Sequence, residues 1–302
     1  MNDIIEYLKE DVLSSVEILK LWNAQGASYV LAALLILLIA KMSFKFFSNF
    51  DFDKEISEKD NKAVAVSFVG FWLAVSIVIC GSLSSETKLY EGEFVLWRDL
   101  LSTVIWGVFG IALLYLSRFI NDKLLLKDFD NRKEVIEDRN VGTAAVELGS
   151  YISSALIIAA CFSGDDYDLV EGVFSTLLFY FLGQIFFLLF ANIYRRLLTF
   201  CIHDEIEKDN YAAGISYGLN FIAISIFISS YIRVSDSVTA LCVWFLLSIV
   251  VLISCRYLVD KILLPKSSLD HEIVNDRNWG AAILEGSSAI IVALIASISF
   301  LA

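Results

Sequence analysis

The chain has 302 residues, 58% of them hydrophobic, and a mean hydropathy of +0.70. Soluble domains carry about 45–50% apolar residues, so the composition excludes an ordinary soluble domain. The net charge of −12 disfavours nucleic acid as a partner, because binding to nucleic acid depends on neutralising phosphates with Lys and Arg.

The first segment, residues 1–26, is predicted to form an amphipathic helix. Apolar residues recur at roughly helical spacing between Asn2 and Trp22, among charged ones. Such a helix either lies on a membrane surface or caps the bundle in solvent, and its acidic face disfavours anionic lipid. No cleavable signal peptide is expected, because the first apolar run begins only near Ala27.

Eight apolar blocks follow, and each is long enough to cross about 30 Å of hydrocarbon. The predicted spans, numbered one to eight, are 27–47, 63–83, 96–120, 141–162, 171–197, 211–232, 237–260 and 279–301. The predicted fold class is all-α, a polytopic membrane protein with eight transmembrane helices and the lipid bilayer as its first partner.

The basic residues predict the orientation of the spans. Of the 23 Lys and Arg residues, 18 fall in the connections that precede the even-numbered spans. Because cytoplasmic loops are enriched in Lys and Arg, these connections are placed in the cytoplasm. Both termini are then predicted to lie outside the cytoplasm of a bacterial inner (plasma) membrane.

A short polar phrase recurs at the start of every even-numbered span. Its constant member is an asparagine, and the four copies are Asp60 and Asn61; Asp138, Arg139 and Asn140; Asp209 and Asn210; Asp276, Arg277 and Asn278. All four copies begin on the same side of the membrane, which predicts four parallel helical hairpins rather than an inverted repeat. The hairpins group into two four-helix units, at 27–165 and 166–302.

The polar phrases have a structural and a functional interpretation. Asp or Asn before an apolar helix caps its first turn. Alternatively, the phrases form a cytoplasmic ring that meets an ion or an acidic partner. Arg139 and Arg277 are expected to pair with nearby Asp side chains or lipid phosphate, or with a carboxylate of another hairpin.

Two glutamates lie inside apolar spans, seven residues after the asparagine in spans four and eight. Glu147 and Glu285 are about 10 Å deeper than these asparagines by helical rise. An intramembrane carboxylate is costly, so it marks either an ion or proton site or an interhelical hydrogen bond. Candidate hydrogen-bond partners are Ser67, Ser216, Tyr217, Asn220 and Gln184.

The even-numbered spans are rich in Ala, Gly and Ser, whereas the odd-numbered spans are bulky. Small residues allow helices to approach closely in a membrane. We therefore expect spans two, four, six and eight at the centre of a ring-like or two-fold bundle. Two matched carboxylates near its axis would suit a cation constriction.

No catalytic, metal or cofactor signature is recognisable. His203 and His271 have no partner at metal-ligand spacing and are expected to be solvated. The five cysteines show no paired spacing and are interpreted as small apolar residues. Neither GxxxxGK, HExxH nor GxSxG occurs, so we expect no enzyme, no metal and no cofactor.

The openings Asp-Asn-x-Ala-x-Ala and Asp-Arg-Asn-x-Gly-x-Ala resemble those of the bacterial inner-membrane proteins named domain of unknown function 350. The resemblance covers nearly the whole chain beyond the first segment, as two tandem units. It implies a helical fold in the plasma membrane and carries no established activity or catalytic residue.

Two functions remain open at this stage. One is a small-ion or proton channel or transporter, in which Glu147 and Glu285 contact a small cation. The other is a non-transporting scaffold or accessory subunit, in which the glutamates are structural. A homo-oligomer fits either.

Overall fold

The computed structural model describes residues 24–48, 50–84, 95–125, 130–162 and 169–301. The amphipathic helix predicted for residues 1–26 lies outside the described residues, except for its last three positions, which begin the first described helix.

Eight of the described helices are long and apolar enough to cross a membrane, which confirms the predicted fold class. Their bounds follow the predicted spans within a few residues: α2 (Ala24–Ser48), α4 (Lys62–Ser84), α5 (Val95–Leu124), α7 (Val141–Cys161), α8 (Leu169–Leu197), α10 (Tyr211–Ile232), α11 (Val238–Leu258) and α13 (Trp279–Leu301). The seventh span continues from α11 into a π-helical turn, η1 (Val259–Leu263).

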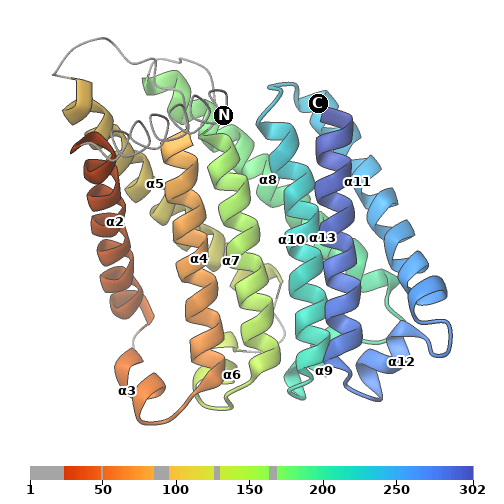
Figure 1. Cartoon of the computed structure of the whole chain (residues 1–302). Coiled ribbons are helices and arrows are strands. Elements are labelled where there is room, and N and C mark those ends of the chain that lie inside the picture. Colours follow the sequence, from red (N-terminus) through yellow and green to blue (C-terminus); the bar gives the residue numbers. More distant parts are fainter. Residues whose placement is uncertain (1–23, 49, 85–94, 126–129, 163–168, 302) are drawn as a thin grey trace, which may run out of the picture.

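A six-residue helix precedes each of the helices α4, α7, α10 and α13. These short helices are α3 (Phe52–Ser57), α6 (Asn131–Ile136), α9 (Ile202–Glu207) and α12 (Leu269–Val274). All four lie at one end of the bundle, at the bottom of Figure 1, and we call it the short-helix end. The basic connections that the sequence places in the cytoplasm therefore meet at one end.

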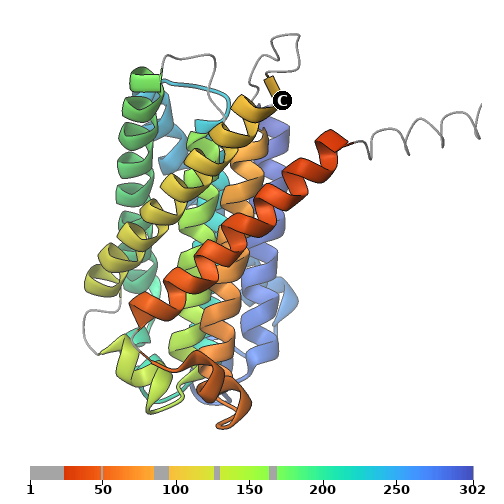
Figure 2. The same cartoon turned by 90° about the vertical axis from the view of Figure 1, so that its left-hand side faces the viewer.

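The four even-numbered spans form a row. The helices α4, α7, α10 and α13 pack one against the next in chain order (Figure 1). The helix α5 packs against α4 and α7, α8 against α7 and α10, and α11 against α10 and α13. The view turned by 90° shows α5 and α8 on one side of the row (Figure 2).

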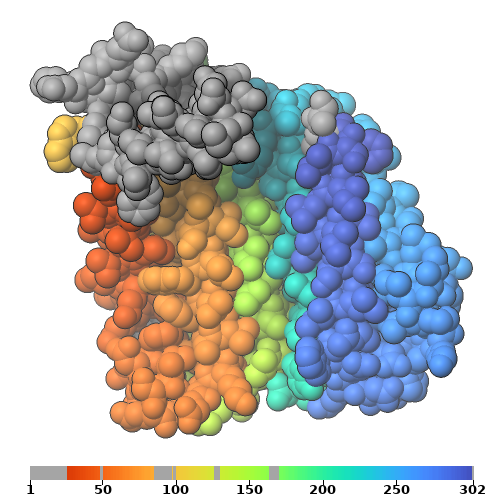
Figure 3. All heavy atoms as spheres, in the orientation of Figure 1, coloured from red at the N-terminus to blue at the C-terminus, as the bar shows by residue number. Residues whose placement is uncertain are grey.

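The row is open, which corrects the expected ring-like arrangement. In the space-filling view, all four helices of the row are visible on one face of the molecule (Figure 3). The two inner helices are the most buried: 72% of the apolar stretch of α7 and 78% of that of α10 are buried. The end helices reach only 50% for α4 and 44% for α13, since each has a row neighbour on one side alone.

Candidate functional site

Each helix of the row begins with the same local backbone geometry. The residue before the capping asparagine has a positive φ in all four units: 49° at Asp60, 55° at Arg139, 55° at Asp209 and 47° at Arg277. Residues other than Gly rarely adopt this left-handed conformation. It ends the short helix and turns the chain sharply, so that the asparagine lies at the first turn of the long helix.

The four asparagines cap the row helices through their side-chain oxygens. Asn61 Oδ1 accepts from the Val64 amide at 3.2 Å, and Asn140 Oδ1 accepts from the Thr143 amide at 2.9 Å. The same contact recurs from Ala213 to Asn210 and from Ala281 to Asn278, each at 3.3 Å. The capping interpretation of these asparagines therefore agrees with the geometry in every unit.

The amide nitrogens of the same asparagines bind glutamates of the short helices. The Nδ2 atoms of Asn61, Asn140, Asn210 and Asn278 donate, in that order, to Glu55 at 3.3 Å, Glu134 at 2.8 Å, Glu205 at 3.0 Å and Glu272 at 2.8 Å. These four glutamates were not predicted as cap partners from the sequence. Their signal was a glutamate followed by Ile or Val, five or six residues before each asparagine.

Three of the asparagines also tie their unit to the next one. Asn61 Nδ2 donates to the Val135 carbonyl at 3.2 Å, in α6. Asn140 donates to the Ile206 carbonyl at 2.7 Å and Asn210 to the Ile273 carbonyl at 2.9 Å. Asn278 lies in the last unit, where its side-chain amide contacts only Glu272 among the described residues.

The ionised form is favoured for Glu55 and Glu205, two of the short-helix glutamates. Burial raises the pKa of Glu55, but the hydrogen bonds from Lys59 and Asn61 and the charge of Arg139 outweigh it, so the net pKa is lowered. Burial likewise raises the pKa of Glu205, but the hydrogen bonds from Asn210 and Lys208 and the charge of Arg277 outweigh this effect. The net pKa of Glu205 is therefore also lowered. Arg139 and Arg277 thus act on a carboxylate of the preceding unit.

Replacing a capping asparagine tests this arrangement. Asn140→Ala is expected to lower the free energy of unfolding by about 2 kcal/mol, at the upper end of the usual cost of losing a cap, because the buried bond to the Ile206 carbonyl of the next unit is also lost. Asn278→Ala is the matched control, with an expected loss of about 1 kcal/mol, since its side chain is exposed and binds no neighbouring unit. Denaturant unfolding in mixed micelles measures both, and equal losses would contradict the role of the inter-unit bond.

Glu285 on α13 lies among polar groups from three other helices and has 1% of its surface exposed. Its carboxylate accepts from Ser216 Oγ at 2.5 Å and from Asn220 Nδ2 at 3.4 Å, both on α10. Tyr194 of α8 donates at 2.6 Å, and Arg256 of α11 forms a direct ion pair with the same carboxylate. The sequence analysis named Ser216 and Asn220 but missed Tyr194 and Arg256.

Arg256 links the buried glutamate to the short-helix end. Its Nη2 contacts Asp270 Oδ1 of α12 at 2.5 Å, and Asp270 in turn accepts from the Thr199 hydroxyl at 2.6 Å. One guanidinium therefore bridges an intramembrane carboxylate and a carboxylate near the surface. The guanidinium makes this bridge with two separate nitrogens, Nη1 to Glu285 and Nη2 to Asp270, whereas Lys has a single nitrogen.

Glu147 on α7 is the equivalent residue of the first half, with 6% of its surface exposed. Ser67 of α4 donates a hydrogen bond to its carboxylate, as the sequence analysis proposed. Glu147, Ser67, Arg118 and Arg132 are among the residues that line a cavity of about 20 Å³. This volume suffices for one water molecule.

The two sites are copies of one arrangement. Arg118 and Arg256 each precede their glutamate by 29 residues. The Arg118 guanidinium lies 5.9 Å from the ring centre of Phe44, and the Arg256 guanidinium lies 5.4 Å from that of Tyr194. The copies differ in the direct ion pair, which only the Glu285 site makes among the described residues.

The two glutamates do not share a site. Glu147 lies at the interface of α4 and α7, and Glu285 at the interface of α10 and α13, while α10 packs between α7 and α13. The exposed face of the row is apolar there, with Leu148, Ile152 and Leu219 half-buried. The two carboxylates, which were expected near one axis, therefore lie at two separate interfaces.

Other expected contacts also differ. Tyr217 donates to the Ala191 carbonyl at 3.2 Å instead of a glutamate, and the Gln184 side chain has no hydrogen-bond partner among the described residues. His203 is buried, with 3% of its surface exposed, whereas His271 is exposed as expected. The expectation for His203 was wrong because its position in the short helix faces the bundle.

The comparisons with known proteins agree with this two-part geometry. The family described as Domain of Unknown Function (DUF350) matches residues 17–162 and again residues 168–300. The chain belongs to the DUF350 family. In this DUF350 chain, each matched region contains one intramembrane glutamate and its arginine 29 residues earlier. The tandem duplication predicted from the polar phrases is thereby confirmed.

One relative is described as a UPF0719 transmembrane protein of Aquifex aeolicus (strain VF5). It is 22% identical over 257 residues, which cover 83% of this DUF350 chain and 90% of the relative. No solved structure matches the chain. Together with the eight membrane-length helices, the relative supports a membrane protein of an uncharacterised family.

Proposed function

We propose that this protein is a non-transporting membrane module, a scaffold or accessory subunit, in which Glu147 and Glu285 hold neighbouring hairpins together. The observation that carries the proposal is the contact set of Glu285. Its carboxylate is occupied by Ser216, Tyr194 and Arg256, and its charge is compensated by the arginine. A carboxylate engaged in this way stabilises helix packing and is poorly placed to exchange an ion.

The proposal includes a location in a plasma membrane, with the short-helix end in the cytoplasm and both termini outside. Of the 23 basic residues, 18 lie in the four connections at that end or in the adjoining parts of the long helices, which supports this orientation. It assigns the protein no catalytic activity. Among the described residues, no group of three or more His, Cys, Asp and Glu side chains is arranged to bind a metal.

A second function, proton or small-cation transport, is favoured by one feature. The cavity beside Glu147 has room for one water molecule and is lined by polar groups, so a proton could reach this carboxylate. This candidate predicts that Glu147, and not Glu285, carries the flux.

Flux in liposomes distinguishes the two functions. With purified protein in vesicles that contain a pH-sensitive dye, we expect proton and cation flux at the level of protein-free vesicles. Glu147→Gln and Glu285→Gln should leave this level unchanged, and Glu285→Gln should lower the melting temperature, because Arg256 loses the more deeply buried of its two charged partners. If flux exceeds the protein-free level and disappears in Glu147→Gln, the scaffold function is contradicted and the transport function is supported.

A further inference from the structure

The three contacts within the row share one register. Counting from the capping asparagine as position 0, position +9 of one row helix meets position +8 of the next. The residue pairs are Gly70 with Leu148, Gly149 with Gly218, and Leu219 with Gly286. Every pair contains a glycine, and a Cβ on that glycine would clash with the neighbour. The register continues to the far end, where position +20 meets position +19: Ser230 Oγ donates to Ser297 Oγ at 3.0 Å.

The three contacts are of two alternating kinds. In the first and third, a serine at +6 donates to the glutamate at +7, as Ser67 does to Glu147 and Ser216 to Glu285. The middle contact between α7 and α10 is apolar at these positions, with Val146 at +6 and Tyr217 at +7. It adds a hydrogen bond at the short-helix end, from the Val141 amide to Asp209 Oδ1 at 3.1 Å.

The end helices resemble the middle contact because their open positions lack a serine–glutamate pair, although they have no glycine at +9 of α13 or +8 of α4. On α13, position +6 is Leu284 and position +9 is the small residue Ser287. On α4, position +7 is Phe68 and position +8 is Val69. Trp279 has the place of Val141, and Asp60 has the place of Asp209, with the same positive φ.

The side-chain amide of Asn278 is a further feature that the end of the row shares with the α7–α10 contact. In the first three units this amide donates to a carbonyl of the next short helix, at Val135, Ile206 or Ile273. The corresponding carbonyl ahead of Asn278 would belong to Ile56 of a further α3. Asn278 is exposed, and its Nδ2 donates only to Glu272 among the described residues, so the second hydrogen of this amide is available.

We propose that α13 of one chain packs against α4 of a second copy of this chain, in the register of the α7–α10 contact, so that the row continues head to tail. Each repeat of such an array contacts only its neighbours, and the array continues wherever an end is not capped by a different surface. The contact uses different patches on the two copies, so it closes into a ring or extends as a row. The proposal does not depend on whether the glutamates carry ions.

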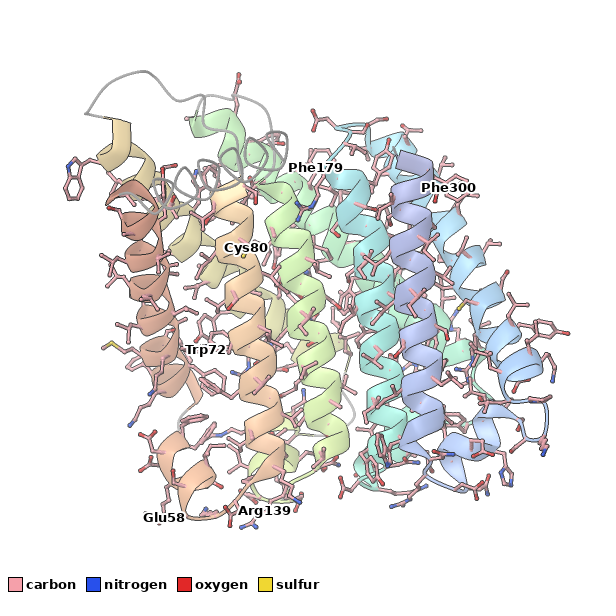
Figure 4. All side chains as sticks on the ribbon, in the orientation of Figure 1. Glu58, Trp72, Cys80, Arg139, Phe179 and Phe300 are labelled. Carbon is pink, nitrogen blue, oxygen red and sulfur yellow. The ribbon has the colours of Figure 1, made fainter. Side chains whose placement is uncertain are left out.

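The native cysteine Cys80 offers a direct test. It lies at +19 on α4, far from the short-helix end and in the upper part of the view that also labels Phe300 on α13 (Figure 4). The shared register places Cys80 opposite position +20 of the neighbouring α13, which is Ile298. Both side chains are exposed in the single chain.

We expect Ile298→Cys to give a ladder of cross-linked dimers and larger species on mild oxidation in native membranes. Ser299→Cys is the matched control at the same depth, turned by about 100° around the helix, and should stay monomeric. Adding Cys80→Ser to Ile298→Cys should abolish the ladder. Monomer alone from Ile298→Cys, or equal products from Ser299→Cys, would overturn the proposal.

Two further outcomes would also overturn it. Dimers from the unmodified chain that disappear with Cys80→Ser would mean that α4 packs on α4. Dimers from Ile298→Cys that persist with Cys80→Ser would point to contacts between α13 helices, or to a different cysteine. A contact of α4 with α4, or of α13 with α13, would be two-fold symmetric and would end the row after two copies.

Gly280→Leu probes the same surface from the short-helix end. Gly280 has the place of Gly142, which faces Gly214 in the middle contact, but a Cβ at Gly280 would meet only Asn278 Oδ1, at 3.1 Å, within the part of the chain that the structure describes. In the Ile298→Cys background, Gly280→Leu should remove most of the ladder and leave the melting temperature of the monomer unchanged. An undiminished ladder would contradict the assigned register.

Discussion

Replacing Arg256 with alanine is expected to lower the free energy of unfolding by about 3–5 kcal/mol, the loss typical of removing one partner of a buried ion pair. The variant leaves the Glu285 carboxylate 99% buried with no compensating charge, since its exposed fraction is 1%. It also removes the contact to Asp270 that fixes α12 against the bundle. Reversible unfolding in mixed micelles, followed by circular dichroism, measures the loss.

Arg118→Ala is the matched control, because Arg118 has the same place in the first half. No hydrogen bond joins it to Glu147 within the described residues, and its ion pair with Asp122 is long, at 3.8 Å. The cavity at Glu147 also has room for a water molecule. We expect a loss of about 1–2 kcal/mol, and a loss as large as that of Arg256→Ala would mean that the two sites are equivalent.

Gly149→Leu is expected to cause the second large effect, a loss of about 3 kcal/mol, at the upper end of the usual cost of overpacking. A Cβ at Gly149 would meet the backbone of Gly218 on α10, and backbone atoms cannot rotate away as a side chain can. The helices α7 and α10 would have to separate, which opens the junction between the two family units. The same unfolding assay measures this loss.

Gly183→Ala on α8 serves as its control. The added Cβ meets the Ile157 Cγ2 methyl group, which belongs to a side chain and not to the backbone of the neighbouring helix. We expect a loss below about 1 kcal/mol. Similar losses at Gly149 and Gly183 would show that the close backbone approach in the row is not what stabilises the junction.

The spans and caps could be predicted from local sequence because their causes are local. Apolar length predicts a membrane helix, and Asn before an apolar run predicts a cap. The depth of Glu147 and Glu285 followed from helical rise alone. The predictions about these features required no knowledge of how the helices pack.

The partners of the glutamates were harder to predict. Arg118 and Arg256 lie near the ends of their spans, so they were counted with the basic loop residues, although their common 29-residue distance from a glutamate was available. The short-helix glutamates resembled ordinary loop charges. In a duplicated chain, a charged residue that recurs at the same distance from a glutamate in both halves can be predicted to lie near that glutamate. Composition alone does not allow this prediction.

The open row was not predictable from the small residues. Glycine, alanine and serine allow close approach of helices, but they do not determine whether four helices close into a ring or line up. In the structure the four helices pack in chain order, and in the space-filling view described parts of all four are visible on one face (Figure 3). The two glutamates therefore lie at different interfaces.

The most direct test of the structural role of the glutamates is a double-mutant cycle between Glu285 and Arg256, with Glu147 and Arg118 as the parallel cycle. Unfolding free energies of the single and double alanine variants give the coupling free energy of each pair. The account predicts a coupling of about 2–3 kcal/mol for Glu285 and Arg256 and less than about 1 kcal/mol for Glu147 and Arg118. Additive losses at Glu285 and Arg256, with no coupling, would contradict it.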